Sequence, residues 1–220
     1  MMSMTPTIAA PVEATMATTT GTTTAQQVLQ MVRERGLLRA RDLAAAGFSP
    51  THLQRLYEQG LLIRSGRGVY LPAEADLDGN GTLAEVALRI PKGVVCLLSA
   101  LQFHSLTTQL PSQVWIALPL RAHRPVVDYP PLRVVRLSGQ ALSEGIETHE
   151  IGGVAVRVYT PAKTVADCFK YRNKIGLEVA LEALRDAWHK RVVTMDDLWY
   201  YAGICRVANV MRPYLESLIV

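Results

Sequence analysis

Gly36, Gly47 and Gly60 divide residues 25–72 into short pieces and limit what this segment can form. Gly36 follows an amphipathic run that begins near Ala25, and Gly47 follows a shorter helical run at residues 40–46. Glycine readily adopts the left-handed conformation that ends many helices. The segment therefore predicts short helices joined by tight turns, not one long helix.

A third helix is predicted directly after the second. Ser49 stands at the expected N-cap, Pro50 at the first helical position and Gly60 at the end, and these residue types are common at helix boundaries. Its apolar residues form one narrow stripe, so the polar residues between them are expected to point away from the core. The stripe consists of Leu53, Leu56 and Tyr57.

Residues 61–72 predict a β-hairpin. Two apolar runs flank Gly66-Arg67-Gly68, and glycine in a short loop favours a tight turn. Arg64 and Arg67 place cations at its tip. Three short helices followed by a basic hairpin are typical of a winged helix-turn-helix. A plain three-helix bundle with an appended hairpin would explain the apolar stripe but not these arginines.

The net charge of +4 is concentrated in the same segment, whereas residues 73–220 are nearly neutral. A protein that binds duplex DNA needs a slim polar helix face for the major groove and cations beside it for the phosphates. We expect the residues of the third helix to contact bases and the others to hold the backbone. The predicted DNA-binding residues are Arg41, Ser49, Thr51, His52, Gln54, Arg55, Arg64 and Arg67.

Residues 82–220 predict a second, mixed α/β domain with a small sheet and C-terminal helices, so the fold class is α+β. Thr82 and Glu85 have the spacing of a capping box at a helix start. Residues 94–104 predict a strand end followed by a buried helix. Further strands are expected at 114–118, 133–137 and 154–159, and late helices at 161–170, at 176–188, after Thr194 and at 208–219, with a bend at Pro213.

Residues 1–24 are rich in threonine and have no periodic apolar face, so they predict a disordered tail. They also lack the charged start and apolar centre of a secretory signal. Residues 73–81 predict a polar linker. No apolar run approaches the roughly 20 residues of a membrane-spanning helix. The expected organisation is a tail (1–24), a DNA-binding domain (25–72) and a regulatory domain (82–220) in a cytoplasmic protein without membrane contact.

No catalytic, cofactor-binding or metal-binding residues are predicted, so no enzyme is expected. The three cysteines and five histidines share no metal-ligand spacing. Residues 76–82 begin like a calcium-binding loop, but Ala87 stands where calcium needs a bidentate carboxylate. Ser99 and His104 lack the glycine-flanked turn that exposes a nucleophile, and we expect them to serve packing.

A basic cluster surrounds the helix expected at 161–170. It could contact nucleic acid or a partner protein, but Asp167 lies four residues after Lys163, and such pairs commonly decorate solvated helices. A solvated helix is therefore the favoured interpretation. The cluster consists of Lys163, Lys170, Arg172 and Lys174.

In their order along residues 25–190, several segments resemble the AbiEi-like antitoxins of type IV toxin–antitoxin systems. The resemblance implies a winged-helix repressor of its own operon, acting at repeated operator sequences. It also implies a C-terminal domain that opposes a nucleotidyltransferase-like toxin without needing a stable complex with it. Pro-Ala-Lys-Thr at 161–164 stands where the family often has Pro-Glu-Arg-Thr. The resembling segments are RARDLAAAG at 39–47, RGVY at 67–70, LSAL at 98–101 with His104, and YTPAKTVADC at 159–168.

Two other functions stay open at this point. In the first, the mixed domain is a nucleic-acid-processing enzyme, which would need clustered acids for a metal; only Asp196 with Asp197 and Asp76 with Asp78 come close. In the second, the winged helix is a protein-interaction module, because a fold does not determine its function.

Overall fold

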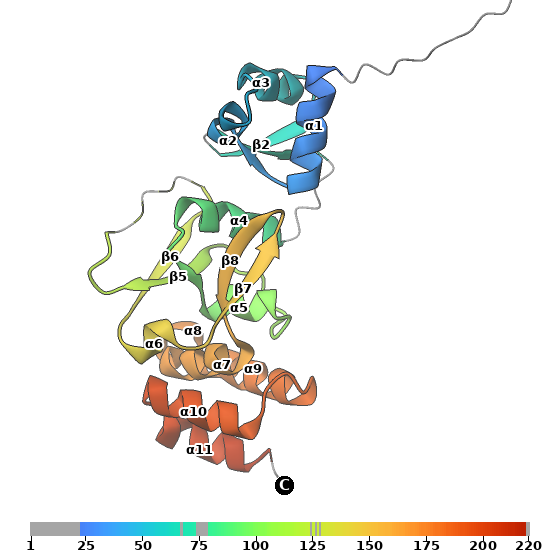
Figure 1. The fold of residues 1–220 in the computed structure, drawn as a ribbon. Helices are drawn as coiled ribbons and strands as arrows, with labels where there is room; N and C mark the ends of the chain where they lie inside the picture. Colours follow the sequence, from blue (N-terminus) through green and yellow to red (C-terminus); the bar gives the residue numbers. More distant parts are fainter. Residues whose placement is uncertain are drawn as a thin grey trace, which may run out of the picture.

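The computed structural model describes residues 23–66, 68–73, 79–123, 125, 127 and 129–218. Residues 23–73, here called the N-terminal unit, form three helices and a three-stranded sheet at one end of the molecule (Figure 1). Its elements are α1 (Thr24–Arg35), β1 (Leu38–Arg39), α2 (Ala40–Ala45), α3 (Thr51–Glu58), β2 (Leu62–Gly66) and β3 (Val69–Pro72).

The predicted helices and hairpin of the N-terminal unit are confirmed, and one strand is added. Thr23 caps α1 through a reciprocal capping box with Gln26, and Gly36 ends it with a φ of 67°. The prediction did not include β1, which pairs Leu38 with Tyr70 of β3. A strand of two residues has no periodicity to detect, yet it completes the sheet order β1-β3-β2.

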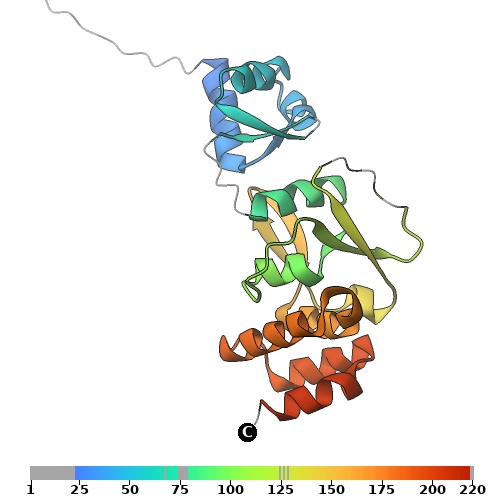
Figure 2. The ribbon, with the colours of Figure 1, turned by 180° about the vertical axis from the view of Figure 1, so that it is seen from behind.

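Residues 79–218, here called the C-terminal unit, contain a five-stranded sheet followed by a group of helices (Figures 1 and 2). The first elements are α4 (Gly79–Arg89), β4 (Val94–Val95), α5 (Leu97–Phe103), β5 (Val114–Pro119), β6 (Leu132–Leu137), α6 (Gln140–Ser143), β7 (Ile146–Ile151) and β8 (Val154–Tyr159). The late helices are α7 (Pro161–Lys170), α8 (Arg172–Ile175), α9 (Leu177–His189), α10 (Met195–Cys205) and α11 (Ala208–Glu216, containing Pro213).

The sheet of the C-terminal unit has the order β6-β5-β4-β8-β7 and is mixed. β5 runs parallel to β6 and β4 parallel to β8, while the other two pairs are antiparallel. The edge strand β7 was not predicted. Its sequence, IETHEI, is polar and has no fully buried residue, so it lacks the apolar pattern by which the other strands were recognised.

The two faces of this sheet bury different cores, because successive side chains of a strand point to opposite sides. Trp115 and Ala117 of β5 pack in one core with the late helices. Ile116 and Leu118 of the same strand pack in the other core with α4. The sheet is therefore covered on both faces.

The N-terminal unit is joined to the C-terminal unit by apolar contact and by close backbone approach. Leu37, Val69 and Leu71 belong to the same core cluster as α4 and the sheet. A Cβ on Gly36 would lie 2.5 Å from the Cα of Gly152, in the β7–β8 turn. The two units therefore share one of their cores.

Helix α4 begins earlier than predicted, and the predicted capping box is wrong. The helix starts at Gly79, so Thr82 lies inside it. Glu85 is 1% exposed and one of its carboxylate oxygens lies 2.5 Å from Arg89. The carboxylate is held by an i, i+4 arginine because it is buried against the sheet, where an unpaired charge is costly.

The predicted tail, linker and calcium-like loop fall only in part on described residues. Residues 1–22 and 74–78 lie outside them. Thr23 and Thr24, assigned to the tail, instead begin α1, and residues 79–81, assigned to the linker, belong to α4. Within the described chain, no helix has the length and apolarity that crossing a membrane requires.

Candidate nucleic-acid interface

The turn between α2 and α3 is built around Gly47. Its φ of 83° is in the left-handed region, which glycine adopts without strain. The next residue, Phe48, donates its backbone N–H to the Leu43 carbonyl at 3.1 Å. The chain therefore turns sharply and presents α3 on the outer end of the N-terminal unit, far from the C-terminal unit (Figure 1).

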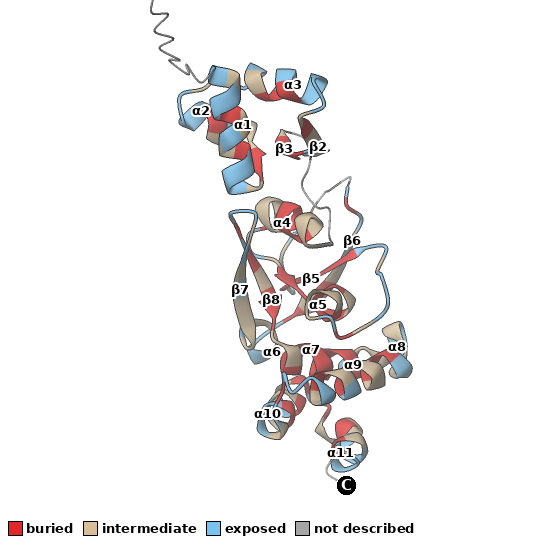
Figure 3. Ribbon diagram, turned by 90° about the vertical axis from the view of Figure 1, so that its right-hand side faces the viewer, coloured by how far each residue is buried: buried red, intermediate tan, exposed pale blue. Residues whose placement is uncertain are grey.

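Helix α3 has one buried and one exposed face. Leu53 is fully buried and Leu56 is 2% exposed, and both pack in the core formed with α1 and β3. His52 is half-buried. The exposed outer face confirms the predicted polar surface (Figure 3). Its residues are Thr51, Gln54, Arg55 and Glu58.

The start of α3 differs slightly from the prediction. The N-cap is Pro50, one residue later than expected. The Ser49 hydroxyl lies 2.8 Å from the hydroxyl of Thr51 and accepts the Thr51 backbone N–H at 3.4 Å. Both hydroxyls are exposed, so this end of α3 presents a small polar surface.

Gln54 is held in place, whereas Arg55 is not. The Gln54 amide donates to Glu58 at 3.0 Å and its oxygen accepts from the Tyr70 hydroxyl at 3.4 Å. Among the described residues, the Arg55 side chain has no hydrogen bond or ion pair. Tyr70 could not be recognised from the sequence, because its link to Gln54 depends on how α3 lies against β3.

The prediction that Tyr57 completes the apolar stripe is wrong. Its side chain is 41% exposed, and its ring meets the Tyr70 ring edge-on with 6.4 Å between centroids. A tyrosine ring can cover a core at its margin while its hydroxyl stays in water. The two rings therefore shield the edge of the small core beneath α3.

The hairpin forms as predicted and carries an irregularity near its tip. Arg64 is exposed and lies opposite Tyr70, and the register shifts between Arg64 and Gly66. Such a bulge redirects the strand and the side chains beside it. Arg67, the other predicted cation of the tip, lies outside the described residues.

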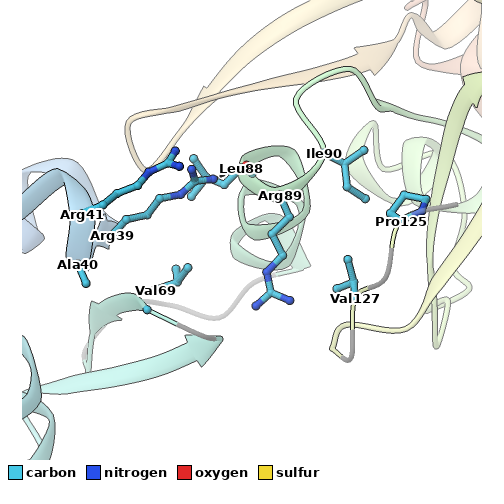
Figure 4. Close-up of a pocket in the computed structure, with 10 residues that line it drawn as sticks. Arg39, Ala40, Arg41, Val69, Leu88, Arg89, Ile90, Pro125 and Val127 are labelled. Carbon is cyan, nitrogen blue, oxygen red and sulfur yellow. Dashed lines mark hydrogen bonds between the residues drawn. The ribbon is translucent and has the colours of Figure 1, made fainter. Parts of the chain in front are cut away.

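Arg41 lies at the junction of the two units and not on α3. It occupies the first turn of α2, its side chain is 73% exposed, and its Nε lies 3.5 Å from a carboxylate oxygen of Asp42. It lines a cavity together with Arg39 and with Arg89 of the C-terminal unit (Figure 4). Arg39 and Arg89 were not among the predicted residues, because nothing in their spacing shows that they line the same cavity.

The interpretation of the helix at 161–170 as solvated is wrong. Lys163 is fully buried, Asp167 is 1% exposed, and their charged atoms are 2.5 Å apart. The Lys163 ammonium also lies 4.1 Å from the centroid of the Tyr159 ring, and Cys205 donates its thiol to Asp167 at 3.2 Å. Burial raises the pKa of the Asp167 carboxyl, and Lys163 opposes this shift. The pair belongs to the core of the C-terminal unit.

The rest of that basic cluster does not converge with Lys163. Lys170 is exposed, Arg172 donates to the Phe169 carbonyl at 2.9 Å, and the Lys174 ammonium lies 5.5 Å from the Tyr171 ring centroid. The cluster is therefore divided between a buried site and a solvated helix end.

The three cysteines are free thiols and are buried. Burial raises the pKa of the Cys96 and Cys168 thiols well above the usual range, and that of Cys205 to about 12. Thiols are nucleophilic as thiolates, so these residues behave as small core side chains.

Ser99 and His104 serve packing, as expected. The buried Ser99 hydroxyl accepts the Trp115 backbone N–H at 3.0 Å. His104 Nε2 lies 2.8 Å from the Tyr159 carbonyl oxygen. The two side chains thus tie α5 and its end to neighbouring strands.

The acidic residues considered for a metal site are used otherwise where the structure describes them. Asp197 donates its backbone N–H to the Thr194 hydroxyl at 3.1 Å, and its carboxylate accepts from that hydroxyl at 2.6 Å. Thr194 with Asp197 therefore caps α10, as predicted. Over the described residues, no group of three or more His, Cys, Asp or Glu side chains could hold a metal ion. Asp76 and Asp78 lie outside them.

Residues 26–73 match the family model described as transcriptional regulator, AbiEi antitoxin. No curated protein is found that matches the chain significantly. The matched residues coincide with α1, α2, α3 and the hairpin. Over residues 26–73 the chain is therefore a winged helix-turn-helix similar to the AbiEi antitoxin transcriptional regulators.

Proposed function

We propose that this protein is a sequence-specific DNA-binding regulator that acts in the cytoplasm and represses its own operon. Residues 25–72 are the proposed DNA-binding domain and residues 82–220 the regulatory domain. The observation that carries the proposal is the outer face of α3, where polar side chains stand on a helix presented at the end of the molecule. The match of this segment to a family of regulators supports it.

Each candidate side chain has a proposed role. Gln54 and Arg55 contact base edges, since a planar amide matches adenine and a guanidinium matches guanine. Thr51 and His52 read bases nearer the helix start. Ser49 and the arginines outside α3 hold phosphates and set the register. These arginines are Arg41, Arg64 and Arg67.

Gln54 has a held amide, and Arg55 has a guanidinium without a partner in the part of the chain that the structure describes, so the two side chains suit different tasks. A preoriented amide loses little conformational entropy on binding. A free arginine can adjust to the groove and form a bidentate pair with a base. The pair of side chains thus combines one fixed and one adjustable contact.

The antitoxin role is also a proposal. It rests on the resemblance of the chain and on the family match of the N-terminal unit. The proposed partners are duplex DNA with repeated operator sequences and, by functional link, a nucleotidyltransferase-like toxin encoded in the same operon.

Fluorescence anisotropy with two labelled duplexes tests the DNA-binding proposal. One duplex comes from the region upstream of the gene and the other has the same composition in scrambled order. We expect preference for the first, lost in part in Arg55→Ala. Arg64→Ala with Arg67→Ala should weaken binding to both duplexes and flatten the salt dependence.

Arg35→Ala is the control, because Arg35 is an exposed arginine of the last turn of α1. It should keep the preference of the wild type. Equal binding of wild type to both duplexes, or equal behaviour of the Arg55 and Arg35 variants, would refute sequence-specific reading by α3.

A further inference from the structure

A groove lined by arginines runs along the junction of the two units. One cavity of about 620 Å³ is lined by Arg39, Arg41 and Arg89. A second, of about 580 Å³, is lined by Arg39, Arg41 and Arg157. Arg39 and Arg41 line both cavities, which are therefore neighbours and are together called the arginine groove.

The arginine groove is assembled from both units. Arg39 ends β1 and Arg41 lies in the first turn of α2, and their side chains extend side by side toward Leu88 (Figure 4). Arg89 comes from the last turn of α4, and Arg157 from β8, opposite Thr148. A ligand in the groove would therefore contact both units at once.

The guanidiniums of the groove are only partly balanced by carboxylates. Arg41 pairs with the exposed Asp42. Arg89 pairs with the buried Glu85 and also donates to the Tyr129 carbonyl at 2.7 Å. Arg39 donates to the carbonyl of Leu88.

Among the described residues, the Arg157 side chain makes no hydrogen bond or ion pair. Burial lowers the pKa of Arg39, and the neighbouring Arg41 and Arg89 lower it further while Asp42 opposes them. The like charges repel one another, and a bound anion would relieve that repulsion.

Guanidinium groups in such an arrangement favour one class of ligand. Arginine presents a planar fork of donors that matches the oxygens of a phosphate. Each cavity is also within the range of about 300 to 1,000 Å³ typical of small-molecule sites.

We propose that the arginine groove is a phosphate-binding site that bridges the two units. Two sources share this chemistry, the backbone of bound DNA and a free phosphorylated molecule. The wing residue Gly68 lines the first of the two cavities, so the wing lies beside the groove. The DNA source rests on the proposed function, whereas the free-phosphate source does not.

The first arm of the test measures DNA binding by the full chain. The salt dependence of affinity for the upstream duplex is compared between wild type, Arg157→Gln and Arg185→Gln. Arg185 is an exposed arginine of α9, remote from the groove, and its replacement by glutamine removes the same charge. Loss of one phosphate contact lowers the slope of log K against log salt by about 0.9, and we expect this only in Arg157→Gln, with Arg157→Lys restoring it.

The second arm uses sodium pyrophosphate in isothermal titration calorimetry, at constant ionic strength. Saturable binding by wild type that weakens about tenfold or more in Arg157→Gln would identify a free phosphate as the source, since this is the effect of losing one charged hydrogen bond. Thermal melting of each variant shows whether it is folded. Arg185→Gln should bind pyrophosphate as wild type does.

Either positive arm supports the arginine groove as a phosphate site and names its source. An unchanged salt slope together with no pyrophosphate binding overturns it. In that case Arg55→Ala still reports on the proposed function, because Arg55 lies on α3 and not in the groove. If wild type binds no DNA, the proposed function fails and the pyrophosphate arm alone decides.

Discussion

Helices α3 and α7 carry the same sequence pattern in opposite surroundings. Each has two polar side chains four residues apart, Gln54 with Glu58 in α3 and Lys163 with Asp167 in α7. The first pair is exposed and the second is buried. Spacing alone therefore indicates that two side chains can contact each other, but it does not show whether they are buried or exposed to solvent.

The difference comes from what surrounds each helix. Helix α7 contacts α5, α9, α10 and α11, and every residue from Ala162 to Phe169 is buried. Helix α3 contacts α1 and β2 and leaves its other side in solvent. Apart from Lys163, Asp167 and Lys170, the residues of α7 are small or apolar, and this composition is the one sign in the sequence that the helix is buried on all sides. The polar residues of α3 are thus exposed and can contact a partner, whereas those of α7 are buried and stabilise the fold.

Breaking the buried pair should give the largest effect. Asp167→Ala leaves the Lys163 ammonium buried without its partner, and we expect a loss of about 3 to 5 kcal/mol in the free energy of unfolding. Urea denaturation of the full chain measures it. Replacing both residues, with Lys163→Met and Asp167→Leu, should recover most of the loss, because no unpaired charge then remains. If Asp167→Ala alone were as stable as wild type, the burial of the pair would be contradicted.

A substitution on the exposed face of α3 should change DNA binding and leave the stability of the fold unchanged. Arg55→Ala is expected to reduce discrimination between the upstream and scrambled duplexes by about 1 to 3 kcal/mol. Its urea denaturation midpoint should stay at the wild-type value, because the side chain has no partner within the described chain. Loss of stability without loss of discrimination would assign Arg55 to the fold.

A pH series should distinguish the interior of the C-terminal unit from its surface. Burial lowers the pKa of the His104 imidazole, although its contact with the Tyr159 carbonyl and the charge of Glu147 oppose the shift. The unfolded chain therefore binds more protons in the window from roughly 6.5 down to the folded-state pKa, and stability should fall as the pH drops through that window.

The readout is the free energy of unfolding from urea titrations at each pH. His104→Gln should flatten the dependence within this window relative to wild type. His52→Gln, a single-histidine variant in α3, serves as the comparison. If both substitutions change the slope by the same amount, the dependence does not come from His104.

The smallest effect is expected for the exposed pair of α3. Glu58→Ala removes the acceptor of the Gln54 amide and should cost no more than about 0.5 kcal/mol, the usual value of an i, i+4 surface pair. Thermal melting of Glu58→Ala and Asp167→Ala under the same conditions compares the two losses of stability. A cost similar to that of Asp167→Ala would show that Glu58 supports the fold through some other contact.

Much of the fold could be predicted because it rests on local rules. Thr160 with Pro161, Thr194 with Asp197, and Gly36 mark helix boundaries through short-range hydrogen bonds and backbone preference. Strands β1 and β7 were not predicted, because they form by pairing with β3 and β8 and their own residues carry no strand pattern.

The candidate interface divides in the same way. The polar face of α3 follows from helical periodicity, so it could be derived from residues 49–60. The two cavities that Arg39 lines, one with Arg89 and one with Arg157, could not be derived in this way, because they depend on how the two units meet. The burial of Lys163 was missed for the same reason, since its surroundings come from elements distant in sequence, among them α5 and α10.

The approach of Gly36 to Gly152 restricts the exchange of parts between relatives. Each glycine has a positive φ, and the backbones meet where a side chain on Gly36 would collide. A foreign winged helix joined to this C-terminal unit would pack correctly only if it had a glycine at the position of Gly36, facing Gly152. Recombination between homologues should therefore succeed only where both halves of this contact are inherited together.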